Sequence, residues 1–441
     1  MSELQEHTRT DDSALLRAVG FWALAASIVN VTIGGSIFAL PGILAVAMGA
    51  AAPLAFIFGA LLFVPIVLCF AAAGSRITAS GGPYSYVHAA FGRFPGFVVA
   101  AVFWISNVAG SGSMAAALAD QLSHAAPRLG EGGSRALLLL AVYCSLMVLN
   151  AWGIRAGAAA IMAFAAAKSL PLILLVILGV RYIHLENLRV TEVPTWTSIG
   201  SSLVIVVFAF SGIETALSPS GEVRDPAKVV PRAAFAGVAV VIGLYVGLQV
   251  VAQGVLGTAL VGNHVPLSAI ADIVVAGGGG VLVLTATVSL IGVLQGDLLG
   301  SSRLLYALAR DGFLPSPLDA VTKTHRVPMR AVVAHGLVAW FLAALGSFTT
   351  LALVSGGAIC LVYIGCCAAA WRLQSTSAGE TDMPLVLPGR SLIPLLGIAG
   401  LLLILATLRL AEWIAIGCAV LAVSVLYMSV RRGSQTLRKY V

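Results

Sequence analysis

Long stretches of this chain carry no charged side chain, and this feature limits the possible folds more than any other. No Asp, Glu, Lys or Arg lies between Arg17 and Arg76, whereas a membrane-spanning helix needs only about 20 consecutive apolar residues. The whole sequence is 59% hydrophobic and 10% charged, and soluble domains carry about 25% charged residues. The apolar runs are long and unbroken, unlike the short alternating strands of a membrane barrel. The sequence therefore predicts an all-α polytopic membrane protein.

Twelve transmembrane helices account for the apolar runs. The first two fill the uncharged stretch and meet near 49–53. The others are predicted at 94–119, 136–153, 156–180, 197–219, 233–257, 267–302, 331–371 (two spans that meet around 346–349), 392–408 and 412–430. This topology places nineteen of the 25 Lys and Arg residues on the side of the N-terminus, five on the other side, and Lys168 inside a span. Because cytoplasmic loops are enriched in Lys and Arg, we expect both termini in the cytoplasm. The net charge of +7 then needs no nucleic-acid partner.

Glycine clusters interrupt two of the predicted spans. Gly34 and Gly35 lie in the first span, and Gly212 lies in the sixth. A broken helix leaves backbone groups without partners, and such breaks persist in a membrane where they border a protein cavity. Breaks in corresponding spans of two halves indicate a transporter built from inverted repeats, with its binding site between them. The alternative is that these glycines are ordinary contacts between packed helices.

The positions of the breaks predict a five-plus-five inverted repeat with discontinuous helices 1 and 6. The predicted segments are a cytoplasmic N-terminal tail at 1–17, a first repeat at 18–183, a second repeat at 184–372, spans 11 and 12 with their preceding loop at 373–431, and a cytoplasmic C-terminal tail at 432–441. A helix N-terminus suits a carboxylate and a helix C-terminus suits an ammonium group, so two breaks suit an α-amino acid. The expected substrate-binding residues at the breaks are Gly34, Gly35, Ser36, Ile37, Ser211 and Gly212.

Four motifs give the chain a resemblance to a known family. They are Gly34-Gly35-Ser36-Ile37-Phe38-Ala39-Leu40-Pro41, Gly81-Gly82-Pro83-Tyr84-Ser85-Tyr86, Phe208-Ala209-Phe210-Ser211-Gly212-Ile213-Glu214, and the segment from Ser302-Arg303 to Leu314-Pro315. In order and spacing they resemble the amino acid–polyamine–organocation (APC) superfamily of permeases along nearly the whole chain. The resemblance implies secondary transport of amino acids or related amines through a LeuT-like fold. Ser36 stands where the family's first-span triplet usually ends in glycine, so its hydroxyl either bonds the ligand or narrows the pocket.

Lys168, Glu214 and Asp297 lie well inside predicted spans, where charged groups usually face a cavity or a partner. The resemblance to sodium-independent family members implies that Lys168 reaches the unwound part of the first span. There it either takes up and releases a coupling proton or remains a fixed counter-charge. Glu214 either supports the hydrogen bonds of the second break or acts in gating or proton relay. Asp297 either pairs with a cationic group of the substrate or pairs with a helix neighbour or water.

Further candidates come from helix walls around the expected site. The third and tenth spans supply small or polar side chains that suit such a wall, namely Ser106, Asn107, Gly110 and Ser355. The same residue types are also common at helix–helix contacts. Phe208 matches a gating aromatic of the family's sixth span, with simple packing as the alternative. His335 lies well inside a span, and we expect it to hydrogen-bond to a neighbouring helix.

The motifs of the sequence favour transport over catalysis. It contains no nucleophile motif, phosphate loop or clustered His/Cys/Asp/Glu metal set, so we expect neither an enzyme nor a cofactor. The predicted function is secondary active transport of amino acids or related amines across a bacterial inner membrane, by proton symport or by exchange with alternating access. A transporter-like sensor without turnover is the alternative, and a channel is a second one. The expected partners are the small-molecule substrate and the lipid bilayer, in a monomer or homodimer. Asp297 favours a basic amino acid or polyamine, and Ser36 favours a small substrate.

Overall fold

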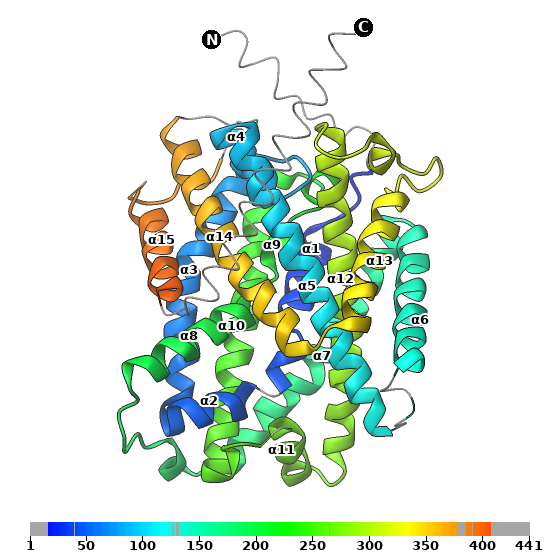
Figure 1. Ribbon diagram of the computed structural model, residues 1–441. Helices are drawn as coiled ribbons and strands as arrows, with labels where there is room; N and C mark the ends of the chain where they lie inside the picture. The colour runs from blue at the N-terminus through cyan, green and yellow to red at the C-terminus, as the bar shows by residue number, and fades with distance from the viewer. Residues whose placement is uncertain are drawn as a thin grey trace, which may run out of the picture.

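The computed structural model describes residues 16–38, 40–125, 128, 132–263, 265–376, 384–389 and 391–406. Within these ranges the chain is nearly all helical and forms no β-strand, and most of its helices run between two ends of the molecule (Figure 1). The α-helices are α1 (Phe21–Thr32), α2 (Leu40–Met48), α3 (Ala52–Arg76), α4 (Pro83–Phe91), α5 (Arg93–Ala125), α6 (Gly132–Ala151), α7 (Ile154–Gly179), α8 (Trp196–Phe210), α9 (Ile213–Ala216), α10 (Pro226–Leu256), α11 (Pro266–Val274), α12 (Gly278–Arg310), α13 (Met329–Leu345), α14 (Phe348–Ser375) and α15 (Leu392–Leu405).

Seven of the described helices are long and apolar enough to cross a membrane, and four shorter ones are apolar. In chain order they form the first eleven predicted spans, with α1 and α2 together as the first and α8 and α9 as the sixth. The twelfth predicted span, 412–430, lies outside the described residues. Large apolar side chains such as Leu170, Leu284, Phe341 and Leu403 are exposed on the outer helices, as lipid-facing surfaces require. The prediction of an all-α polytopic membrane protein is confirmed.

The predicted eighth span, 267–302, is wrong as a single helix. The structure divides this stretch into α11 and α12, which are joined by a turn at Gly277 with φ of +76°. The Asp272 side chain accepts the backbone N–H of Gly279 at 2.8 Å and so fixes the reversal of the chain. The boundary between α11 and α12 could not be predicted, because the turn consists of valine, alanine and glycine, which do not lower the apolar content of the run.

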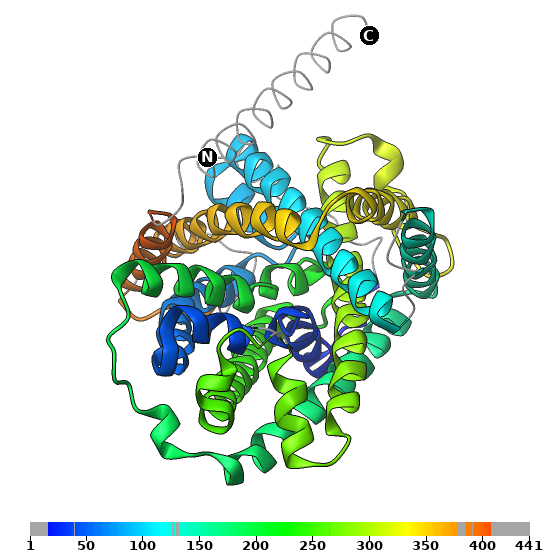
Figure 2. The ribbon, with the colours of Figure 1, turned by 60° about the horizontal axis from the view of Figure 1, so that its bottom comes forward.

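Both predicted breaks are present. Helix α1 ends at Thr32, and the chain becomes helical again in a short 3₁₀ turn, η1 (Ser36–Phe38), before α2. Helix α8 ends at Phe210, and α9 starts after a turn at 211–212. Helix α1 packs against α7, α10 and α12, and α9 packs against α1 and α12. Figure 2 shows α1, in dark blue, surrounded by these helices. The two broken spans therefore lie at the centre of the bundle.

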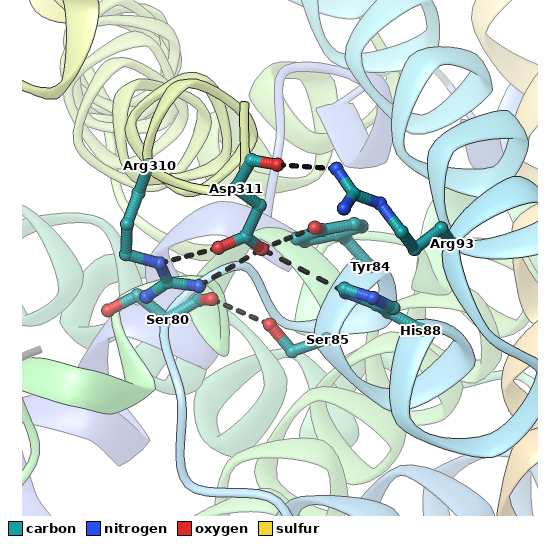
Figure 3. A network of polar contacts seen from close by, with 7 residues as sticks. All are labelled: Ser80, Tyr84, Ser85, His88, Arg93, Arg310 and Asp311. Atoms are coloured by element: carbon teal, nitrogen blue, oxygen red, sulfur yellow. Dashed lines mark hydrogen bonds and ion pairs between the residues drawn. The ribbon is translucent and has the colours of Figure 1, made fainter. Parts of the chain in front are cut away.

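A polar network fastens α4 to the end of α12 (Figure 3). Asp311, directly after α12, accepts a hydrogen bond from the Tyr84 hydroxyl. Its carboxylate also accepts from Arg310 Nε at 2.9 Å and lies 3.9 Å from His88 Nδ1. The backbone carbonyl of Asp311 accepts from Arg93 at 3.1 Å. One acidic residue thus joins α4, the start of α5 and the end of α12.

Candidate functional site

A cavity of about 80 Å³ lies between the two breaks. Both broken spans, α5, α12 and α14 contribute to its wall, which consists of Val31, Thr32, Gly34, Ser36, Ser106, Asn107, Gly110, Ser111, Met114, Ala209, Ser211, Gly212, Glu214, Thr215, Val293, Asp297 and Ser355. Most of these side chains are small or carry a hydroxyl or amide group. The cavity therefore offers hydrogen-bonding groups from several helices to a small polar molecule.

The cavity brings together most of the residues singled out from the sequence. Those that line it are Gly34, Ser36, Ser106, Asn107, Gly110, Ser211, Gly212, Glu214, Asp297 and Ser355. Gly35 and Ile37 do not line it. A Cβ at Gly35 would lie 2.5 Å from a methyl carbon of Leu290, so Gly35 packs against α12, and the Ile37 side chain is fully buried in the apolar core. The side chain of Phe208 lies outside what the structure describes.

Several lining residues were missed by sequence reasoning. On α5, Ser111 and Met114 follow Asn107 at intervals of four and three residues, which places all three on one face of a helix. Val293 precedes Asp297 by one helical turn on α12 in the same way. Helical periodicity, extended from the predicted wall residues, was the signal that could have found them. Thr215 on α9 had no such signal.

Side chains of other helices donate hydrogen bonds to the backbone carbonyls at the first break. Lys168 on α7 is fully buried, and its ammonium group donates to the backbone carbonyls of Asn30 at 2.6 Å and Ile33 at 2.7 Å. The Tyr245 hydroxyl on α10 donates to the carbonyl of Thr32 at 2.9 Å. The last carbonyls of a helix lack intrahelical partners and carry its partial negative charge. The protein itself thus satisfies carbonyls that the break exposes, and Lys168 does not line the cavity.

The second break is held by Glu214, which is buried. One carboxylate oxygen accepts the backbone N–H of Gly212 at 2.9 Å, and the other accepts the Tyr363 hydroxyl at 2.7 Å. These are the contacts that a supporting role for Glu214 requires. Gly212 has φ of +130°, and a Cβ there would lie 2.9 Å from the backbone nitrogen of Thr32. The two breaks therefore touch one another, at a position that only glycine fits without strain.

Asp297 has protein partners for both of its carboxylate oxygens. One oxygen accepts from the Ser301 hydroxyl at 2.9 Å, and the other lies 2.8 Å from Nε2 of His335 on α13. This arrangement favours pairing with helix neighbours over pairing with a cationic substrate. It also supplies the contact with a neighbouring helix that was expected of His335.

A chain of hydrogen bonds continues from this pair along the cavity wall. The Asn107 amide on α5 donates to Ser301 Oγ at 2.9 Å, and the Thr215 hydroxyl on α9 donates to Asn107 Oδ1 at 3.2 Å. The neighbouring Ser106 donates to the carbonyl of Ser355 on α14 at 2.9 Å. Within the described residues, no group of three or more His, Cys, Asp or Glu side chains is placed to hold a metal ion.

Comparison with known proteins shows to which family the chain belongs. Residues 19–430 match the model of the amino acid permease family. The chain is 24% identical to the serine/threonine exchanger SteT of Bacillus subtilis over 426 residues, which cover 93% of this chain and 95% of that protein. It is 26% identical to the branched-chain amino acid permease BcaP of the same species, with 93% of each chain covered. It is 25% identical to the b(0,+)-type amino acid transporter 1 of Mus musculus, covering 75% of this chain and 71% of that one. These relatives are membrane transporters and not enzymes, and this chain belongs to the amino acid permease family of the APC superfamily.

Proposed function

We propose that this chain is a secondary active transporter that moves small neutral amino acids across a bacterial inner membrane by alternating access. The observation that carries the proposal is the cavity between the two broken spans, bordered by Gly34 and Ser36 on one side and by Ser211 and Gly212 on the other. Broken helices of this kind present helix ends to a ligand in the middle of a membrane. The first repeat, 18–183, and the second, 184–372, are the two bodies that would move relative to one another.

The two breaks offer opposite partial charges to a zwitterion. The C-terminal end of α8 meets the cavity at Ala209 and Ser211, and a helix C-terminus attracts an ammonium group. At the first break the freed carbonyls are already bound by Lys168 and Tyr245. The chain then re-enters a helix at Ser36, where the first N–H groups lack intrahelical acceptors. We infer that the substrate's ammonium group lies at the second break and its carboxylate at the first.

Four observations favour a small and neutral substrate side chain. The Ser36 hydroxymethyl group occupies space that glycine would leave open beside Gly34, and the cavity measures about 80 Å³. Two acidic side chains line the cavity, and both are engaged by the protein: Asp297 by Ser301 and His335, and Glu214 by Gly212 and Tyr363. The serine/threonine exchanger and the branched-chain permease among the relatives carry neutral amino acids in their names.

Counterflow in proteoliposomes tests the proposal. Vesicles containing the purified protein are loaded with one unlabelled amino acid at a time, and the entry of radiolabelled L-serine is measured. We expect serine, threonine and alanine inside the vesicle to drive entry, and lysine and putrescine to fail. Binding of L-serine without counterflow would identify a sensor, and flux that does not saturate would identify a channel. Either result contradicts the proposal.

The variant Ser36→Gly gives this experiment a test of substrate size. We expect the wild type to exclude leucine and isoleucine. Removing the hydroxymethyl group should admit them and should improve their competition against L-serine by about tenfold, the scale of one or two methylene groups in a pocket. Ser80→Gly, on the loop before α4 and away from the cavity, controls for the effect of an added glycine. An unchanged order of competitors in Ser36→Gly would remove Ser36 from the pocket wall.

A further inference from the structure

The Asp297–His335 pair lies inside the membrane-spanning part of the bundle and beside the cavity. Asp297 lines the cavity from α12, and His335, which is fully buried on α13, lies behind it with the two side chains 2.8 Å apart. An ionisable group in this position is expensive and usually serves transport. The proposed binding of the substrate's ammonium and carboxylate groups at the two breaks does not involve the Asp297–His335 pair.

The protonation of the pair follows from its geometry. An ionised Asp297 carboxylate can only accept hydrogen bonds, and in that state of the pair Nε2 of His335 carries the hydrogen between the two side chains. The other ring nitrogen, Nδ1, is then a free base, and it has no hydrogen-bond partner among the residues that the structure describes. Binding one proton there forms an N–H bond and converts carboxylate–imidazole, with a net charge of −1, into carboxylate–imidazolium, with none.

The surrounding charges favour this uptake. Glu214 on α9 lines the same cavity, and its carboxylate repels that of Asp297. The hydroxyl of Tyr143 on α6 also interacts with Asp297, and a tyrosine hydroxyl is ordinarily uncharged at neutral pH. Lys168 on α7 is engaged by the carbonyls of the first break. Within the described residues, His335 is the only ionisable side chain in ion-pair contact with Asp297.

The pair is connected to the part of the cavity where a substrate would bind. Asp297 accepts from Ser301, Ser301 accepts from Asn107, and Asn107 accepts from Thr215 on the broken sixth span. Asn107 and Thr215 both line the cavity. A ligand that bonds to either of them therefore perturbs a continuous chain of buried hydrogen bonds that ends on the pair, and the reverse holds by linkage.

We propose that the Asp297–His335 pair is a proton-binding site that couples proton entry to amino acid transport. The proposal rests on the proposed function and adds its driving ion. The pair takes up one proton while the cavity is open to the outside and releases it when the cavity opens to the cytoplasm. The transport is then proton symport, and Lys168 serves as a fixed counter-charge.

The test compares two modes of transport in the same proteoliposomes. Counterflow of radiolabelled L-serine at equal pH on both sides needs no driving ion, whereas accumulation of L-serine under an inside-alkaline pH gradient does. His335→Gln keeps an amide donor for Asp297 but cannot bind the proton, and His335 does not line the cavity. We expect this variant to retain counterflow at the wild-type rate and to lose accumulation above equilibrium. His325→Gln, on an exposed loop, is the matched control and should behave as the wild type.

The possible results distinguish failure of the proton site from failure of the proposed transport function. Accumulation by His335→Gln at the wild-type level overturns the proton site. So does a wild type that performs L-serine counterflow but neither accumulates L-serine nor acidifies vesicles containing a pH-sensitive dye. A wild type without counterflow contradicts the proposed function instead. Asp297→Asn, which keeps the shape of the carboxyl group, provides a second variant if His335→Gln does not fold. It should lose serine-driven proton entry into the vesicles, and retention of that entry overturns the proton site.

Discussion

The ammonium group of Lys168 stabilises the first break by donating hydrogen bonds to its backbone carbonyls. Its ammonium group has three N–H donors, two of which reach the carbonyls of Asn30 and Ile33 at 2.6 and 2.7 Å, with the carbonyl of Ser289 at 3.5 Å as a third neighbour. The hydroxyl of Ser289 adds bonds to the carbonyls of Ile33 at 3.0 Å and Gly34 at 3.2 Å. The negative end of α1 is the counter-charge to the ammonium group. Losing a proton would remove one of these donors, so the contacts favour a lysine that stays charged.

Replacing Lys168 with methionine should destabilise the protein. Methionine fills similar volume but leaves the carbonyl of Asn30 without its Lys168 donor and that of Ile33 with only the Ser289 hydroxyl, and a buried group without a partner costs about 1–3 kcal/mol. We expect a lower unfolding temperature for purified Lys168→Met in detergent and little L-serine counterflow. Ser169→Ala, at the next position on α7, is the control, because the hydroxyl of Ser169 is buried without a hydrogen-bond partner in the part of the chain described. An unfolding temperature of Lys168→Met equal to that of the control would refute the structural role.

The contact between α4 and the end of α12 contains a histidine, His88, whose pKa is shifted by its surroundings. Burial lowers the pKa of His88 below its ordinary value of 6.5, and the nearby Arg93 and Arg310 act in the same direction, while Asp311 opposes them. Burial, followed by the charge of Asp311, raises the pKa of the Tyr84 hydroxyl, which therefore stays protonated and donates to Asp311. The network of Figure 3 is centred on Asp311, and the lowered pKa favours the neutral form of its member His88.

The unfolding temperature should fall on mild acidification, and His88 should account for part of the fall. Above pH 6.5 the imidazole is neutral in both the folded and the unfolded chain. As the pH drops below 6.5, the unfolded chain binds a proton on His88 before the folded one does, so stability decreases until the pH passes the folded pKa. His88→Gln removes this contribution. Its unfolding temperature should depend less steeply on pH than that of the wild type or of His325→Gln, and equal slopes would contradict the assignment.

The sequence predicted where the helices and their breaks lie better than it predicted which way individual residues face. The two breaks and the polar face of α5 were foreseen because glycine and hydroxyl groups stand out in an apolar run. Gly34 and Gly35 were treated alike, yet one borders the cavity and the other packs against Leu290. Adjacent residues at the start of a tight turn point to different sides, which composition does not reveal. The partner of Asp297 could not be predicted either, because His335 is 38 residues away and the contact depends on the rotation of α12 against α13.

At the scale of the whole molecule, the two ends of the bundle differ in charge. Figure 1 places α4 at one end and α11 at the other. The connection between α12 and α13, at the end with α4, and the helix ends that it joins carry Arg310, Lys323, Arg326 and Arg330 against Asp311 and Asp319. The segment between α7 and α8, at the opposite end, contains two arginines and two acidic residues, Glu186 and Glu192, so that their charges balance. Cytoplasmic loops carry the excess of Lys and Arg, so we propose that the end with α4 faces the cytoplasm.

Single cysteines test this orientation in intact bacteria. The six native cysteines are first replaced by alanine or serine, and L-serine uptake confirms that the protein still works. Thr191→Cys, in the segment between α7 and α8, and Thr324→Cys, between α12 and α13, then place one exposed thiol at each end. A membrane-impermeant maleimide should label the first in whole cells and the second only after permeabilisation. The opposite pattern would invert the protein in the membrane. The end with α4 would then face the outside, which contradicts the proposed orientation.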